Sequence, residues 1–377
     1  MNPLVKLQEY GQSIWYDNIE RRLLFNGELA RMIAEEGVLG LTSNPTIFER
    51  AISGSDDYDQ EILRLAQQGH NDEHIYEVLT IQDIQQAADL LRPVYERTDG
   101  LDGYASLEVS PHLAHDAEGT IAEARRLFAA VDRPNLMIKV PGTSEGIPVI
   151  EELIGSGINV NVTLLFAESA YEQAARAYIR GLERYASGGG DVSKVASVAS
   201  FFVSRIDGNS DKRIQFAADS SADPAEQEML RSLQGKTAIA NSKLAYQRFE
   251  EIFGEPRFEP LRARGARVQR MLWASTSTKN PAYPDTMYVD QLIGPDTVNT
   301  VPQKTLEAFR DHGNPEPATV MKDVDQAALN LESLDAAGID LDDITAELLA
   351  QGVASFSASY DNLLKVIAEK KSTLITT

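Results

Sequence analysis

Short apolar runs alternate with longer stretches of helical periodicity along most of the chain. Runs rich in Val, Ile and Leu and bounded by turn residues predict strands, whereas apolar positions repeated every three or four residues predict helices. Such alternation is typical of a parallel α/β sheet or barrel. The predicted strands are Ser13–Asp17, Val38–Ser43, Tyr104–Ser110, Asn135–Gly142, Ile158–Leu165, Val195–Phe202, Val268–Ala274 and Thr286–Asp290.

The segments between the strands predict helices, and two regions add helices of their own. An amphipathic stretch over residues 26–36 ends at Gly37, a residue type that favours helix C-termini. Residues 55–97 have a helical pattern without a clear strand, which indicates helices inserted before the third strand. The last predicted helix carries an apolar stripe that must pack on another surface: Ile344, Leu348, Val353, Phe356, Tyr360, Leu364 and Ile367.

The whole pattern predicts one (β/α)8 barrel, or TIM barrel, with inserted and C-terminal helices. Because the sequence has no internal repeat, low-complexity linker or shift in composition, we expect residues 1–377 to form a single domain. Residues 320–377 are expected to form a helical extension packed on the barrel. In a barrel of this kind the reactive groups lie at the C-terminal ends of the strands.

Several predicted strands carry polar side chains late on one face, while their other face is apolar. Singly, these residues have ordinary explanations: Asp17 could cap a helix, Asn44 could be a turn residue, and Glu108 could be a charge at a strand end. Those explanations do not account for the repetition on successive strands. A barrel would bring the following residues into one pocket: Asp17, Thr42, Asn44, Glu108, Lys139, Asn161, Thr163 and Ser200.

Lys139 lies near the end of the apolar stretch Asn135–Gly142, two residues before Pro141. Leu136 and Val140 share one face of this strand, and Lys139 lies on the other, because strand side chains alternate. If the strand is an inner one, the lysine points into protein. Burial disfavours the ammonium form, so such a lysine can become a nucleophile that forms a Schiff base with a carbonyl. The alternative is a side chain that extends into solvent from the strand end.

Composition and net charge exclude several classes of partner and of chemistry. The formal charge is −22, and no cluster of Lys and Arg is visible, which argues against a nucleic-acid partner. No run of about 18 apolar residues predicts a membrane span, and the N-terminal residues lack the pattern of a signal peptide. The absence of cysteine excludes disulfides and thiolate chemistry. We therefore expect a cytoplasmic protein. A protein of this charge can still bind small phosphates, but only through locally placed cations.

Motifs for metal and nucleotide cofactors are missing from the sequence. Two histidine pairs have helical spacing, but neither has a carboxylate pattern that indicates a metal site. Gly188–Gly190 ends a predicted helix and lacks the lysine of a phosphate-binding loop, and no dinucleotide fingerprint opens the chain. We expect neither metal nor cofactor. The histidines are His70, His74, His112, His115 and His312.

Three motifs in this order resemble those of transaldolases, in the longer bacterial form: Leu41–Pro45, Asn135–Pro141 and Ile158–Phe166. Ser200–Arg205 and Ala274–Ser277 match further, and the resemblance runs from about residue 12 to residue 305. It implies a (β/α)8 barrel of the pentose phosphate pathway. Such an enzyme would move a dihydroxyacetone unit from sedoheptulose 7-phosphate or fructose 6-phosphate to erythrose 4-phosphate or glyceraldehyde 3-phosphate, without a cofactor.

The resemblance also implies a role for each matching residue. Lys139 corresponds to the Schiff-base lysine and Asp17 to the general acid and base at the C4 hydroxyl. Glu108 and Thr163 correspond to the pair that holds a water for proton transfer. The implied substrate-binding residues are Asn44, Thr42, Asn161, Ser200, Phe202, Arg205, Ser275 and Lys279. The expected partners are sugar phosphates, and the expected protein is a monomer or homodimer.

One position departs from the shorter members of that family. Ser277 stands where they have a second phosphate-binding arginine, and Lys279 could reach the same phosphate. Phe202 favours transfer, because a tyrosine would be expected there in relatives that release free dihydroxyacetone. Two alternatives stay open: an aldolase that releases a free ketone from the same lysine, and a barrel that binds sugar phosphates without catalysis.

Overall fold

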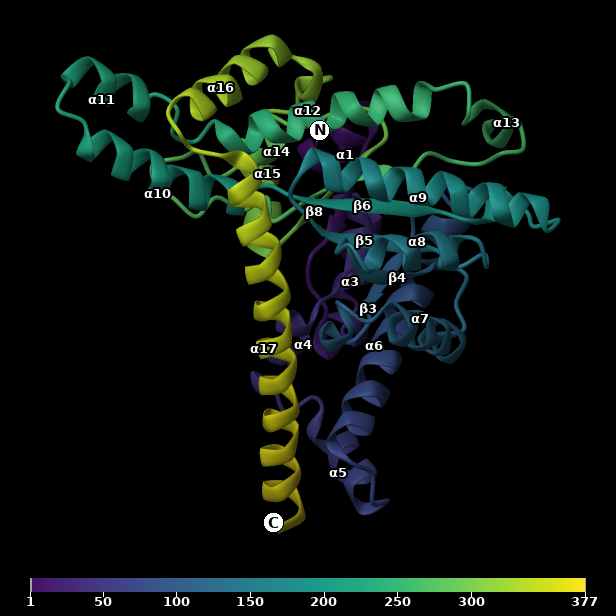
Figure 1. The fold of residues 1–377 in the computed structure, drawn as a ribbon. Coiled ribbons are helices and arrows are strands. Elements are labelled where there is room, and N and C mark those ends of the chain that lie inside the picture. The colour runs from purple at the N-terminus through teal and green to yellow at the C-terminus, as the bar shows by residue number, and fades with distance from the viewer. Residues whose placement is uncertain (1, 377) are drawn as a thin grey trace.

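Eight parallel strands close into a barrel in their sequence order in the computed structural model, which describes residues 2–376. This closure confirms the predicted (β/α)8 fold, and Figure 1 shows helices around the strands. Seven of the predicted strands form within a few residues of their expected bounds. The strands are β1 (Gln12–Tyr16), β2 (Val38–Thr42), β3 (Ala105–Glu108), β4 (Leu136–Pro141), β5 (Val160–Leu165), β6 (Ser197–Phe202), β7 (Arg270–Ala274) and β8 (Thr297–Val301).

The predicted position of the eighth strand is wrong. Residues Thr286–Asp290 belong to a helical turn, α14 (Met287–Asp290), in which Thr286 Oγ1 donates a 2.6 Å hydrogen bond to Asp290 Oδ2. The last strand is β8, which pairs with both β7 and β1 and so closes the barrel. Its sequence, Thr-Val-Asn-Thr-Val, contains no two consecutive apolar residues and so gives no apolar run from which to predict a strand.

Helices fill the regions between the strands, as the periodicity predicts. The helix expected over residues 26–36 forms over residues 28–36, where α3 (Glu28–Arg31) continues directly into a π-helical turn (Met32–Glu36). Gly27, with a left-handed φ of +88°, separates this segment from α2 (Arg21–Phe25). Gly37, with φ of +80°, ends the segment as predicted. The α-helices other than α14 are α1 (Pro3–Glu9), α2 (Arg21–Phe25), α3 (Glu28–Arg31), α4 (Pro45–Ser53), α5 (Asp59–Gln67), α6 (Asp72–Arg97), α7 (Ala117–Val131), α8 (Gly146–Ile154), α9 (Glu168–Ser187), α10 (Ser204–Ser220), α11 (Pro224–Arg231), α12 (Thr237–Gly254), α13 (Glu259–Arg262), α15 (Gln303–His312), α16 (Val324–Ala336) and α17 (Leu341–Thr376).

The long helix α17 lies across the other elements and packs against α4, α5, α6 and α10 (Figure 1). Its buried side chains include Ile344, Leu348 and Phe356, as the apolar stripe predicts. At Gly352 the helix approaches β5 closely: a Cβ there would lie 2.8 Å from Cδ2 of Leu164. Leu164 itself has φ of +60° at an irregularity in the strand. This approach seats α17 against the C-terminal end of β5.

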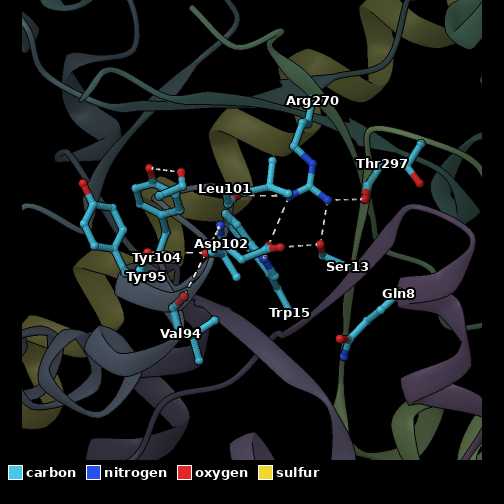
Figure 2. A network of polar contacts seen from close by, with 12 residues as sticks. Gln8, Ser13, Trp15, Val94, Tyr95, Leu101, Asp102, Tyr104, Arg270 and Thr297 are labelled. Atoms are coloured by element: carbon cyan, nitrogen blue, oxygen red, sulfur yellow. Dashed lines mark hydrogen bonds and ion pairs between the residues drawn. The ribbon is translucent and has the colours of Figure 1, made fainter. Parts of the chain in front are cut away.

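A buried ion pair fills the N-terminal end of the barrel (Figure 2). Arg270 Nη1 lies 3.1 Å from Asp102 Oδ1, and its Nη2 donates 2.6 Å and 2.7 Å hydrogen bonds to Ser13 Oγ and the Thr297 carbonyl. Trp15 Nε1 also donates to Asp102 Oδ1 at 2.9 Å. These contacts tie β1, β7 and β8 to the loop before β3, at the end of the barrel opposite the predicted pocket.

None of the helices within residues 2–376 combines the length and apolar character needed to cross a bilayer.

Candidate functional site

The C-terminal ends of the strands surround a cavity of about 250 Å³. All the predicted site residues line it except Glu108 and Asn161, whose side chains lie just behind its wall. The barrel therefore brings together groups that are far apart in sequence. The predicted residues in the wall are Asp17, Thr42, Asn44, Lys139, Thr163, Ser200, Phe202, Arg205, Ser275 and Lys279.

Lys139 on β4 points into this cavity and is only 5% exposed. Its Nζ donates a 3.2 Å hydrogen bond to the carbonyl of Ser43 and lies 3.2 Å from Oε2 of Glu108. The centroid of the Phe356 ring is 5.7 Å from the same nitrogen. The sequence pattern left two positions open for this side chain, inside the protein or extended into solvent. The structure shows the interior position.

Glu108 lies beside Lys139 because parallel pairing sets the two residues opposite each other on β3 and β4. Its Oε2 contacts the ammonium without the alignment of a hydrogen bond, so the interaction is ionic. Burial raises the pKa of Glu108, the charge of Lys139 opposes this shift, and Asp17 adds to it. Thr163 Oγ1 is also buried and has no hydrogen-bond partner among the described residues. The Thr163 hydroxyl and the remaining lone pairs of the Glu108 carboxylate can therefore bind a water molecule.

Asp17 follows β1 and reaches the same cavity from another part of the barrel. Thr42 Oγ1 donates a 2.9 Å hydrogen bond to Asp17 Oδ1 and lies 2.6 Å from Oγ1 of Thr300. Burial raises the pKa of Asp17, and the charge of Lys139 is the largest effect that opposes it. The carboxyl group is therefore held by a fixed partner and accepts a proton more readily than a solvated aspartate does.

In the free protein the side chain of Asn161 on β5 is hydrogen-bonded to two serine side chains. Ser200 Oγ donates a 2.7 Å hydrogen bond to Asn161 Oδ1, and Asn161 Nδ2 donates to Ser106 Oγ at 3.1 Å. Ser200, but not Asn161, reaches the cavity wall. Asn44 caps α4, because its Oδ1 accepts the Ile47 N–H at 3.0 Å, and its Nδ2 has no partner among residues 2–376. The amide of Asn44 can therefore still donate to a ligand.

Three cations face the outer part of the cavity: Arg50, Arg205 and Lys279. Within the described chain none of them has a carboxylate at ion-pair distance, although the net charge is −22. Burial lowers the pKa of Arg205, and burial together with the charge of Arg205 lowers that of Lys279. The Lys279 ammonium contacts Ser277 Oγ, and the Arg205 guanidinium lies 5.3 Å from the centroid of Phe202. Unpaired cations gathered in one place favour a dianionic ligand such as a phosphate.

The remaining polar contact at this end of the cavity involves Ser275. Its φ of +57° is left-handed, and its Oγ lies 3.0 Å from Oγ of Ser204, the first residue of α10. This contact joins the loop after β7 to the N-terminus of the helix that carries Arg205. Ser275 therefore has a position from which a hydroxyl can reach a group held by the cations.

Among the wall residues that the sequence prediction missed are Arg50, Thr300 and Phe356. Thr300 was missed because its strand, β8, was predicted at the wrong place. Arg50 follows Asn44 on the first turns of α4, so the Asn-Pro turn could have drawn attention to it. Phe356 belongs to the apolar stripe of α17, which indicates packing and gives no sign of a catalytic neighbour.

Comparison with known proteins agrees with this geometry. The family model described as "Transaldolase/Fructose-6-phosphate aldolase" matches residues 14–367. A protein from Thiobacillus denitrificans named "Transaldolase" is 49% identical over 367 residues, which cover 97% of this chain and 100% of that protein. "Transaldolase 2" of Nostoc punctiforme is 47% identical over 372 residues, covering 98% and 97% of the two chains. The "Transaldolase" of Trichodesmium erythraeum is 47% identical over 371 residues, with 98% and 97% coverage.

Proposed function

Because this chain belongs to the transaldolase/fructose-6-phosphate aldolase family, we propose that it is a transaldolase. It transfers a dihydroxyacetone unit from sedoheptulose 7-phosphate or fructose 6-phosphate to glyceraldehyde 3-phosphate or erythrose 4-phosphate, in the non-oxidative pentose phosphate pathway and without a cofactor. The observation that carries this proposal is the buried Lys139 amine, in contact with Glu108, at the bottom of a cavity whose outer part holds unpaired cations.

Lys139 forms the covalent intermediate with the ketose carbonyl in this proposal. The ammonium and the C=O group combine to an iminium ion and one water molecule, so two protons move from nitrogen to the departing oxygen. Glu108 carries these protons, because its carboxylate is 3.2 Å from Nζ and burial raises its pKa. A water molecule held between Glu108 and Thr163 extends its reach to the oxygen.

Asp17 supplies the acid and base for the carbon–carbon step. Its carboxylate takes the proton of the C4 hydroxyl while the bond between C3 and C4 breaks and the electron pair moves into the iminium system. The same proton returns to the aldehyde oxygen when the bond re-forms with the acceptor. The hydrogen bond from Thr42 fixes the carboxylate, which limits the positions from which it can act.

Polar groups on both sides of the lysine position the sugar. Asn44 and Ser200 hold the hydroxyls of the dihydroxyacetone unit, and Asn161 orients Ser200 and contributes its own amide when the substrate rearranges the local hydrogen bonds. Arg205 and Lys279 bind the phosphate, with Ser275 as an additional donor and Arg50 as a further cation. Thr42 stands between Asp17 and the sugar.

Phe202 lies in the cavity wall. In this proposal it favours transfer over release of free dihydroxyacetone. An aromatic ring without a hydroxyl offers no proton for hydrolysis of the intermediate. The second candidate function, an aldolase that releases the ketone, is distinguished by its products. Fructose 6-phosphate alone would then yield free dihydroxyacetone as fast as fructose 6-phosphate with erythrose 4-phosphate consumes the acceptor.

Borohydride trapping tests the proposal directly. The protein is incubated with fructose 6-phosphate, reduced with borohydride and digested, and the peptide that contains Lys139 is weighed by mass spectrometry. We expect this peptide to carry the mass of the reduced dihydroxyacetone adduct, and the unreduced sample to transfer the unit to erythrose 4-phosphate. A peptide without added mass would remove both enzymatic functions and leave a sugar-phosphate-binding barrel. A cytoplasmic location and a monomeric or homodimeric state belong to the same proposal.

A further inference from the structure

A second cavity, of about 440 Å³, lies between the end of β3 and helices α6, α7 and α17. We call it the side cavity; its inner lining includes Tyr76, Thr80, Glu108, Ser110, Glu123 and Tyr360. Glu108 lines this cavity and not the substrate cavity. The same carboxylate is 3.2 Å from the Lys139 amine. Glu108 therefore connects the nitrogen at which the imine forms with a separate opening on the protein surface.

The Oε2 atom of Glu108 is buried and has no hydrogen-bond partner among residues 2–376, while the residue as a whole is 9% exposed. Its one polar contact among these residues is the ion pair with the Lys139 ammonium, so the other lone pairs of the carboxylate are available to water. The residues around it are suited to further waters. Glu123 Oε2 accepts the Ser110 N–H at 3.2 Å, and the Tyr76 hydroxyl has no protein partner in the part of the chain described.

Tyr76, Glu108, Glu123 and Tyr360 line the same cavity, so their charges affect one another's pKa values. Burial raises the pKa of Tyr76, and the charges of Tyr360, Glu108 and Glu123 raise it further. Burial also raises the pKa values of Glu108 and Glu123. Carboxyl groups of this kind exchange protons more readily near neutral pH than solvated ones do. In the described residues no group of carboxylates and histidines has the arrangement of a metal site. The hydroxyl and carboxyl groups of the lining are suited to bind water.

The substrate cavity of about 250 Å³ adjoins an outer cavity of about 650 Å³, and Asp17, Arg50 and Lys279 line both. A sugar phosphate bound at Lys139, with its phosphate at the two cations, lies between the imine site and the outer cavity. Imine formation nevertheless releases one water molecule, and hydrolysis of the imine consumes one. Both events happen at Lys139 while the sugar blocks the substrate entrance.

We propose that the side cavity is a water path that supplies and drains the imine site through Glu108, and that Glu123 and Tyr76 are positioning residues for its waters. This inference rests on the proposed function. During imine formation, two protons leave the Lys139 nitrogen by way of Glu108 and join the carbonyl oxygen, and the water so formed leaves through the side cavity. Hydrolysis runs the same path in reverse, so no proton or oxygen atom is left over.

Two variants, Glu123→Gln and Tyr76→Phe, test this proposal. In each variant the rates of the water-dependent steps are measured separately from the rate of the carbon–carbon step. Rapid mixing with fructose 6-phosphate, followed by quenching with borohydride, gives the rate of adduct formation. Release of dihydroxyacetone from the adduct without an acceptor gives the rate of hydrolysis. The third rate is the consumption of erythrose 4-phosphate by preformed adduct, which measures bond formation alone. We expect the first two rates to fall about tenfold in each variant and the third to stay within about twofold, since the loss of a relay group costs less than the direct loss of an acid or base.

Glu73→Gln is the matched control, because it removes the same charge from the exposed rim of the same cavity. It should leave all three rates unchanged. The proposal is overturned if adduct formation and hydrolysis keep their wild-type rates in the folded variants, or if bond formation slows in parallel with them. Tyr76→Phe keeps the test decisive should Glu123→Gln fail to fold. Absence of any adduct in the wild-type protein would contradict the proposed function instead.

Discussion

The ring of Phe356 lies over the amine of Lys139, with 5.7 Å between the ring centroid and Nζ. The two residues belong to α17 and β4, elements that are far apart in the sequence. The positive charge stays on this nitrogen when the ammonium becomes an iminium ion, and the face of an aromatic ring stabilises such a charge. The contact therefore makes the C-terminal helix part of the proposed imine site.

Phe356→Leu should lower the amount of covalent intermediate while the helix stays in place. A cation–π contact contributes about 0.5–2 kcal/mol, which corresponds to about a twofold to thirtyfold loss of adduct at equilibrium. The measurement is the fraction of protein labelled by borohydride at saturating fructose 6-phosphate. Phe309→Leu, at a buried position on α15 away from the cavity, is the control. Equal labelling of the two variants would show that the ring has no part in the reaction.

Lys139→Arg should have no turnover, because guanidinium does not form an imine. The positive charge beside Glu108 is retained, so the fold is expected to survive. Activity with fructose 6-phosphate and erythrose 4-phosphate, together with far-ultraviolet circular dichroism, checks both expectations. Turnover in this variant, or in Lys139→Ala, would disprove the role given to the lysine.

Asp17→Asn should form the adduct but slow carbon–carbon cleavage by about two to four orders of magnitude. Burial raises the pKa of Asp17, and the active form of this base is the carboxylate. The cleavage rate of the wild-type protein should therefore fall as the pH drops through that raised pKa, at a higher pH than an ordinary aspartate would give. The variant should lose this acid limb. If adduct formation falls instead and cleavage does not, the roles of Asp17 and Glu108 are exchanged.

Arg205→Ala should raise the KM for fructose 6-phosphate by about tenfold to a hundredfold, because a hydrogen bond to a charged group contributes about 1.5–3 kcal/mol. Arg50→Ala and Lys279→Ala should raise the same KM by smaller factors, because both groups lie nearer to solvent. Unphosphorylated dihydroxyacetone should react almost unchanged in all of them.

Arg22→Ala provides the control for this series. It removes the same charge from an exposed arginine that pairs with Asp57, away from the cavity. A rise in the KM for dihydroxyacetone equal to the rise for fructose 6-phosphate would mean that the cations support the fold and do not bind phosphate.

Asp102→Asn should reduce the free energy of unfolding by about 3–5 kcal/mol, since it leaves the buried guanidinium of Arg270 without its counter-charge. Urea denaturation measures this difference. Asp311→Asn removes the same charge from an exposed position and should cost less than about 0.5 kcal/mol. A loss as small as that for Asp102→Asn would show that the network in Figure 2 contributes little to stability.

The first seven strands were predictable because each is an apolar run between clear turn signals. β8 was not, because Thr297 and Asn299 direct polar groups into hydrogen bonds that only the closed barrel supplies. The alternation of side chains gave the correct inward face of β4, and with it the burial of Lys139. The alternation of side chains does not show how far an inward side chain lies from the cavity. It therefore did not distinguish Ser200, which lines the cavity wall, from Asn161, which lies behind it.

Contacts between distant parts of the chain could not be predicted from the local sequence pattern. The ion pair of Arg270 with Asp102 and the approach of Phe356 to Lys139 depend on how the barrel closes and where α17 docks. The apolar stripe of α17 predicted that the helix is packed, but not which surface it covers. It also indicated Leu364, whereas Leu363 is the residue that the structure buries.

The docking of α17 has a consequence for how the protein is made. A ribosome that has just added Val301 has built every strand of the barrel, yet residues 302–356 must follow before the ring of Phe356 exists. Until then Lys139 of the nascent barrel lacks this cover. If the proposed function holds, the complete imine site is acquired late in biosynthesis, when the newly made helix settles across a cylinder that is already complete.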